Sequence, residues 1–272
     1  MNNKLKSIEL FLALGVATTT TISLSSDVLV NAEEIESSTV TTQFLAQSGE
    51  GGEGGEGGEG GEGGEGGEGG EGGEGGEGGA ELSPGEQANE DFQDKLSGAE
   101  LLSALQEGGH IIYFRHAQTE KDYADQVTAN VDDCSTQRAL SEEGWQQAKA
   151  IGVGFADNSI PLGQVISSEY CRAWQTADIA FGKYEKNPAL NFLPFEDYTE
   201  EQVAQMKTNV MPLLTVQPES GTNTVIVGHD DIFESATGIY PAPQGMAYVL
   251  TPDGNGGFEI IANMLPEEWS QF

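Results

Sequence analysis

The sequence predicts an α/β fold: a three-layer sandwich in which a mostly parallel central sheet has helices on both faces. Short apolar runs typical of buried strands alternate with longer segments whose apolar residues recur at helical spacing. Strands that alternate with helices form parallel sheets covered on both faces. The last two runs, 247–250 and 258–261, flank Asp-Gly-Asn-Gly at 253–256. This turn predicts a hairpin that adds an antiparallel edge to the sheet.

The first half of the domain begins with a helix predicted over 91–107, where apolar residues recur at near-helical spacing before a glycine pair. The apolar residues of 110–114 predict a buried strand, and a long loop over 117–139 follows. Ser141 is a typical N-cap, and the two glutamates that follow it suit the first turn of a helix, so we expect a helix over 141–155.

The second half repeats the alternation after a Pro-Leu-Gly turn. We expect a short strand at 165–168 and a helix over 172–180. A longer helix over 199–215 leads to the apolar strand 223–228, and a short helix over 231–237 precedes the hairpin.

The N-terminal residues 1–32 are interpreted as a secretory signal peptide. Lys4 and Lys6 precede an apolar segment at 10–17, and Val-Asn-Ala at 30–32 is a small-residue cleavage site. The apolar stretch is shorter than the roughly 18 residues of a membrane span. We therefore expect an exported protein (periplasmic, secreted or cell-surface) whose mature domain is not inserted in a membrane.

The next segment, 33–87, is predicted to be a disordered, low-complexity region. It contains ten perfect Glu-Gly-Gly triplets at 50–79, whose glutamates repel one another and whose glycines leave little to bury. The remaining residues, 88–272, have the composition of a globular domain and are long enough for one sizeable core.

The chain is strongly acidic, with a formal net charge of −34. This charge argues against nucleic acid and anionic membrane surfaces as partners. Only three arginines occur, Arg115, Arg138 and Arg172. The two cysteines, Cys134 and Cys171, are either two buried thiols or one disulfide, and in an exported chain we expect the disulfide.

A histidine lies just after the end of each of two predicted strands. Arg115 and His116 follow the first strand, and His229 follows the strand 223–228. In open α/β sheets ligands bind beyond the carboxyl ends of the strands. We expect these residues to converge there with Arg172, at the start of a helix, and to form a site for an anion.

A phosphoryl group is the anion that these residue types suit best. Arginine bonds two oxygens at once and stays protonated. A histidine can attack phosphorus when one ring nitrogen is free and the other donates to a fixed acceptor. A carboxylic acid near the leaving oxygen would supply a proton and then activate water.

Four motifs carry a resemblance. Arg-His-Ala at 115–117 resembles the Arg-His-Gly signature of the histidine phosphatase superfamily, which includes phosphoglycerate mutases and acid phosphatases. Residues 168–177 are similar to that family's second segment, 140–148 to its intervening helix start and 227–229 to the segment with its second histidine. The resemblance spans about 110–254, and it implies a phosphoglycerate mutase-like fold.

The resemblance also implies roles for single residues. His116 is implied as the nucleophile, and the residues implied to bind the phosphoryl oxygens are Arg115, Arg172 and His229. Asp230 directly follows the second histidine, as the proton donor does in acid phosphatases, although Glu196, Asp197 and Asp231 are alternatives. Ala117 departs from the family's glycine.

We therefore expect an exported phosphomonoesterase that hydrolyses small phosphate esters through a phosphohistidine, without metal or other cofactor. One alternative is a protein of the same fold that binds or senses phosphate esters with little or no turnover. A second is a metal-dependent hydrolase, although no clustered ligand spacing occurs. A mutase is a further, weaker alternative.

Overall fold

The computed structural model describes residues 82–121, 125, 129–193 and 198–272. The predicted signal peptide, the Glu-Gly-Gly repeat and the candidate donors Glu196 and Asp197 lie outside these residues. In chain order the elements are α1 (Pro84–Glu90), α2 (Gly98–Glu107), β1 (Ile111–Arg115), η1 (Cys134–Thr136), α3 (Glu142–Asp157), β2 (Leu162–Ser167), α4 (Cys171–Phe181), β3 (Glu185–Lys186), η2 (Pro188–Leu190), α5 (Glu200–Thr215), β4 (Asn223–Gly228), α6 (Asp230–Thr237), β5 (Ala247–Pro252), β6 (Phe258–Met264) and η3 (Glu268–Ser270).

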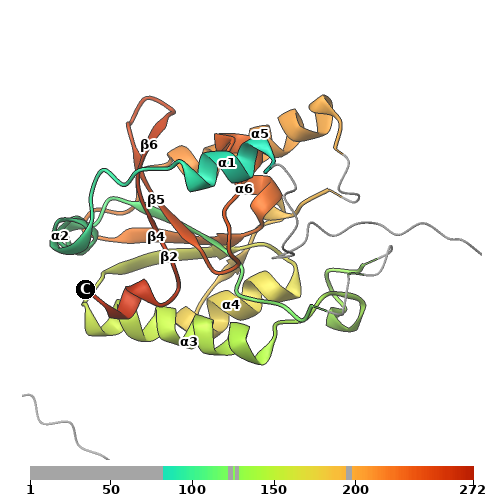
Figure 1. The fold of residues 1–272 in the computed structure, drawn as a ribbon, viewed down its shortest axis with the longest axis horizontal. Coiled ribbons are helices and arrows are strands. Elements are labelled where there is room, and N and C mark those ends of the chain that lie inside the picture. Colours follow the sequence, from blue (N-terminus) through green and yellow to red (C-terminus); the bar gives the residue numbers. More distant parts are fainter. Residues whose placement is uncertain (1–81, 122–124, 126–128, 194–197) are drawn as a thin grey trace, which may run out of the picture. The chain divides into compact units, whose positions relative to one another are not determined.

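The six strands form one sheet in the order β3-β2-β4-β1-β5-β6. The first four strands of this order run parallel to their neighbours, and β5 and β6 run antiparallel. The predicted fold class, a mostly parallel sheet between helices with a C-terminal hairpin at its edge, is confirmed (Figure 1).

Each face of the sheet has its own apolar core, because successive side chains of a strand point to opposite faces. In β1, Ile112 and Phe114 pack with residues of α2, α3 and α4. Ile111 and Tyr113 pack with residues of α5 and α6 instead. Figure 1 shows α3 and α4 on one side of the sheet and α5 and α6 on the other. The strand ends therefore belong to a sheet that is packed on both faces.

The helix predicted over 91–107 is wrong in its first half, and the fold begins earlier than residue 88. A capping box between Ser83 and Glu86 starts α1 at Pro84, so that the predicted boundary falls inside a helix. Residues 91–97 link α1 to α2 because the amides of Lys95 and Leu96 donate to Ile261 of β6. Among the described residues, no helix combines the length and apolar character needed to cross a membrane.

Candidate active site

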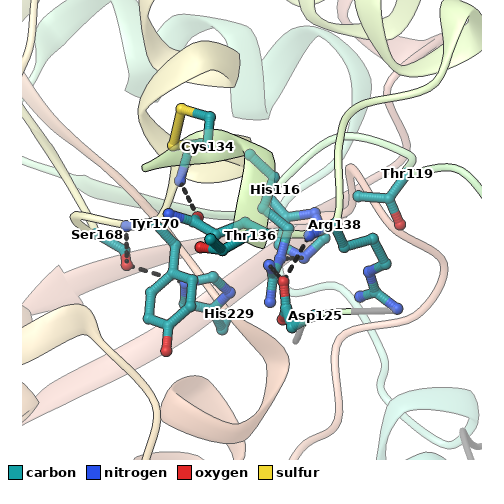
Figure 2. Close-up of polar contacts among 12 residues, drawn as sticks. His116, Thr119, Asp125, Cys134, Thr136, Arg138, Ser168, Tyr170 and His229 are labelled. Atoms are coloured by element: carbon teal, nitrogen blue, oxygen red, sulfur yellow. Dashed lines mark hydrogen bonds and ion pairs between the residues drawn. A yellow bond between two sulfur atoms is a disulfide. The ribbon is translucent and has the colours of Figure 1, made fainter. Parts of the chain in front are cut away.

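Three parallel strands end side by side at one edge of the sheet. Arg115 of β1 pairs with Gly228 of β4, and Ser167 of β2 pairs with Val227 of β4. The residues that follow these ends are His116, His229 and Ser168, so all three lie at the same edge. The rings of the two histidines are 5.4 Å apart between centroids. The predicted convergence of the histidines at the sheet edge is thus observed (Figure 2).

His116 is a neutral base with a defined tautomer. Its Nδ1 lies 2.8 Å from the carbonyl oxygen of Ala117, which can only accept, so Nδ1 carries the hydrogen. The Nε–H of Arg172 donates to Nε2 of His116 at 3.2 Å. Burial, and then the charge of Arg172, hold the pKa of His116 well below its usual range. The lone pair on Nε2 is therefore directed at the guanidinium of Arg172, a cationic group that can also bind a phosphoryl oxygen.

The loop after His116 is held by the motif residues around it. Thr176 accepts from the amide of Ala117 and donates to the carbonyl of Arg172, and so links the two site segments. Ser141 caps α3, and its hydroxyl also donates to the carbonyl of Gln118. Gly144 lies so close to that carbonyl that any Cβ would overlap it. The serine and glycine of the helix-start motif therefore position the nucleophile loop.

Arg172 reaches a second partner that the sequence did not reveal. The Arg172 side chain is 4% exposed, and its Nη1 lies 3.0 Å from Oδ1 of Asp125. The same carboxylate oxygen accepts from the amide of Arg138 at 2.6 Å. Figure 2 shows Asp125 in the site beside His116 and Arg138. An anion that binds Nη1 of Arg172 must share this nitrogen with Asp125 or displace the carboxylate.

Arg138 acts on the site as a cation. Its charge contributes to lowering the pKa of both His116 and His229. Asp133, an acidic neighbour along the chain, caps η1 by accepting from the amide of Ser135.

The predicted disulfide between Cys134 and Cys171 is present, with its Cα atoms 5.7 Å apart. It joins the long loop to the first residue of α4, directly before Arg172. Gln137, which is 1% exposed, reinforces this link because its Oε1 accepts from the amide of Cys171. The loop is thus tied to the helix that presents Arg172.

Arg115 lies at the end of β1 and pairs with Asp230. Its Nη2 is 2.6 Å from Oδ2 of Asp230, and its Nη1 donates to the carbonyl of Pro241. Burial alone would raise the pKa of Asp230, but Arg115, Tyr240 and neighbouring groups outweigh it, and the pKa is lowered. Asp230 is therefore ionised.

Asp231 differs from its neighbour. Burial, followed by repulsion from Asp230, raises the pKa of Asp231 to about 7. Its Oδ2 lies 3.1 Å from the hydroxyl of Tyr198, which also contacts the carbonyl of Leu193 at 3.0 Å. A tyrosine hydroxyl has one hydrogen to donate, so the protonated form of Asp231 satisfies both contacts.

His229 is held at both backbone and side chain. The hydroxyl of Tyr113 accepts from the His229 amide and donates to its carbonyl, and it packs against Gly228, where a Cβ would overlap it. The ring lies edge-on to Tyr170 and Phe192 and contacts Ser168 at 2.9 Å. Burial, and then Arg172, hold the pKa of His229 well below its usual range.

The five predicted site residues thus form two linked groups. In the first group, Arg172 donates to His116, and the ring of His116 lies next to that of His229. In the second group, Arg115 forms an ion pair with Asp230. Within the described part of the chain, no three histidine, cysteine, aspartate or glutamate residues gather as a metal ion would require. Chemically, the arrangement offers a neutral nucleophile, several fixed cations and carboxyl groups in two protonation states.

Residues 111–214 match the model of the histidine phosphatase superfamily (branch 1). Among solved structures, the chain is similar to the protein histidine phosphatase SixA complexed with tungstate, with 14% identity and a TM-score of 0.42 over 58% of this chain and 97% of that one. It is also similar to a phosphoserine phosphatase mutant from Entamoeba histolytica in complex with phosphoserine (14% identity, TM-score 0.40, 57% and 95% of the two chains). A mycobacterial glucosyl-3-phosphoglycerate phosphatase is similar at 16% identity and a TM-score of 0.40, over 56% and 97%. No curated protein matches the sequence.

Proposed function

The chain belongs to the histidine phosphatase superfamily, and from this premise we propose that it is a phosphatase for small phosphate monoesters. In this proposal Nε2 of His116 attacks phosphorus and the ester oxygen leaves with a proton. Water then attacks the phosphohistidine, which releases inorganic phosphate and restores the free Nε2. No step requires a metal ion or another cofactor.

One observation carries the proposal: Nε2 of His116 is unprotonated and lies 3.2 Å from Nε of Arg172. The hydrogen bond from Nδ1 to Ala117 fixes the tautomer that attack requires, and it continues to bind the ring when positive charge develops. Arg172 and Arg115 supply fixed positive charge for the phosphoryl oxygens, which is the main requirement of phosphoryl transfer.

The proposal is tested with p-nitrophenyl phosphate and EDTA from acid to neutral pH. We expect steady release of p-nitrophenolate that EDTA leaves unchanged, and a phosphoenzyme that survives alkaline quench but is lost in acid. Because burial lowers the pKa of His116, its free base should persist and activity should extend into the acid range.

Other outcomes identify the alternatives. Phosphate binding without any release of p-nitrophenolate would favour a binding or sensing protein. Activity abolished by EDTA and restored by a divalent cation would favour a metal-dependent hydrolase. Transfer of the phosphoryl group to an added alcohol in preference to water would favour a mutase.

We also propose Asp230 as the proton donor. Its ion pair with Arg115 favours the ionised form. A phosphoryl dianion would compete for Arg115 and bring negative charge near the carboxylate, and both effects raise its pKa.

Asp230→Asn should therefore discriminate between leaving groups. We expect a loss of about 10²-fold or more in kcat/KM for an alkyl phosphate, because an alkoxide cannot leave without a proton. The loss for p-nitrophenyl phosphate should be far smaller, because p-nitrophenolate leaves unprotonated. Asp231→Asn is the matched control. A selective loss in Asp231→Asn, or equal losses on both substrates in Asp230→Asn, would remove Asp230 from this role.

Export remains part of the proposal. The signal-like segment at 1–32 and the disulfide between Cys134 and Cys171 support an oxidising compartment. The strong net negative charge of the chain would disfavour highly anionic substrates at low salt, which supports small monoesters.

A further inference from the structure

The hydroxyl of Ser168 contacts three partners in a buried hydrogen-bond network next to His229. Its hydroxyl oxygen lies 2.9 Å from Nε2 of His229 and 2.8 Å from Oδ1 of Asn191. It also accepts from the amide of Tyr170 at 3.2 Å. Ser168 is 0% exposed and His229 is 1% exposed, so water does not substitute freely for these partners. Ser168 lies in the second motif, but Asn191 lies in no motif (Figure 2 shows Ser168, Tyr170 and His229).

The orientation of the Asn191 amide is set by its own contacts. The amide of Glu169 donates to Oδ1 of Asn191 at 3.0 Å. The Nδ2 of Asn191 donates to Oε2 of the same glutamate at 2.7 Å. A backbone N–H can only donate, so the Asn191 atom that receives it is the amide oxygen, and the two ends of the amide are distinguished. Oδ1 therefore faces Ser168 as an acceptor.

The single hydrogen of the Ser168 hydroxyl determines which partner donates in the contact with His229. The hydroxyl of Ser168 has one hydrogen, and Oδ1 of Asn191 takes it. The remaining contact, with Nε2 of His229, must be a donation from the ring to the hydroxyl oxygen. Neutral His229 therefore carries its hydrogen on Nε2. His116 is the opposite tautomer, with its hydrogen on Nδ1.

This assignment limits what neutral His229 can do for an anion. Its only N–H is committed to Ser168, and its Nδ1 holds a lone pair that repels phosphoryl oxygens. Tyr170 and Phe192 stand edge-on to the ring on the side of α4 and η2 and hinder its reorientation. His229 can bind a phosphoryl oxygen only through Nδ1, and only after Nδ1 has gained a proton.

The charged groups around His229 keep it neutral until an anion arrives. Burial and Arg172 lower its pKa, and the other charged groups that act on it are Asp230, which raises the pKa, and Arg138 and Arg115, which lower it. The ring of His116 also faces it. A bound phosphoryl dianion would offset the arginine charges and favour the imidazolium.

We propose that Asn191 and Ser168 are positioning residues that hold the hydrogen of neutral His229 on Nε2, so that phosphoryl binding is coupled to uptake of one proton at Nδ1. A dianion binds with a proton from solvent, whereas a monoanion hands over its own; in both cases the N–H bond forms at Nδ1. The identity of the ligand rests on the proposed function, but the tautomer does not.

The tautomer is tested by NMR of the full chain labelled with ¹⁵N-histidine. The chain has only three histidines, so single replacements assign every imidazole. In the ligand-free protein we expect His229 to show the Nε2–H pattern and His116 the Nδ1–H pattern. An Nδ1–H pattern for His229 in the unsubstituted protein would overturn the proposal.

Three variants and one control separate a positioning role from a general loss of structure. Asn191→Ala frees the Ser168 hydroxyl to donate to Nε2, so His229 should shift toward the Nδ1–H form. Ser168→Ala should also lose the Nε2–H preference, and Ser168→Thr, which keeps a hydroxyl, should restore it. Ser167→Ala is the matched control, because this buried hydroxyl donates to a backbone carbonyl and not to a ring. An unchanged His229 tautomer in both Asn191→Ala and Ser168→Ala would refute the role of the two residues.

Proton uptake is measured by titration calorimetry with inorganic phosphate in buffers of different ionisation enthalpy, above the second pKa of phosphate. We expect about one proton taken up per phosphate bound, and a clearly smaller uptake together with weaker binding in Ser168→Ala. Binding with no proton uptake would overturn the coupling. These results do not depend on turnover: an inactive chain that shows them would contradict only the proposed hydrolysis.

Discussion

His116→Ala should reduce turnover of p-nitrophenyl phosphate by about 10³-fold or more, since it removes the atom that forms the covalent intermediate. No phosphoenzyme should survive alkaline quench in this variant. Phosphate binding should be retained, because Arg172, Arg115 and His229 remain and the space left by the ring admits the anion. The measurements are initial rates, quench trapping and calorimetry with inorganic phosphate.

His110→Ala is the matched control for this substitution. His110 is the one histidine away from the site, where its Nδ1 contacts the hydroxyl of Thr251. It should keep full activity, and its thermal unfolding should be compared with that of His116→Ala. Turnover that persists in a folded His116→Ala protein would exclude His116 as the nucleophile.

The sequence predicted most of the fold because strand and helix periodicity is local. The apolar run at 223–228 coincides with β4, and the N-cap Ser141 begins α3 as expected. The helix over 91–107 failed because two of its amides bond to Ile261, far along the chain. Local spacing contains no information about such a partner.

The difference between local sequence pattern and long-range contact also explains which site residues could be predicted. Arg115, His116 and His229 could be found because each directly follows an apolar strand, and parallel strands bring their ends together. Asp125 and Asn191 could not be found, because each reaches its partner from a loop of no regular pattern. Their roles depend on three-dimensional hydrogen-bond geometry, which single-sequence motifs do not encode.

Arg172→Ala should also greatly reduce the catalytic efficiency of the enzyme. Arg172 contacts Nε2 of His116 and is a residue through which the site can bind a phosphoryl oxygen. We expect kcat/KM for p-nitrophenyl phosphate to fall by about 10²- to 10³-fold. Arg172→Lys should recover only part of the loss, because an ammonium lacks the planar fork that reaches His116 and Asp125 together. Lys186→Ala is the control for the loss of a cation outside the site.

The pH profile distinguishes this role from a purely structural one. After burial, the charge of Arg172 is the largest cause of the lowered pKa of His116. Without that charge the pKa of His116 rises, so a larger fraction of the nucleophile is protonated at acid pH. The acid limb of kcat/KM should therefore move to higher pH in Arg172→Ala and stay in place in Arg172→Lys, which keeps the charge. A uniform loss at every pH would mean that Arg172 acts through binding or folding alone, and that the protonation of His116 is set by its burial.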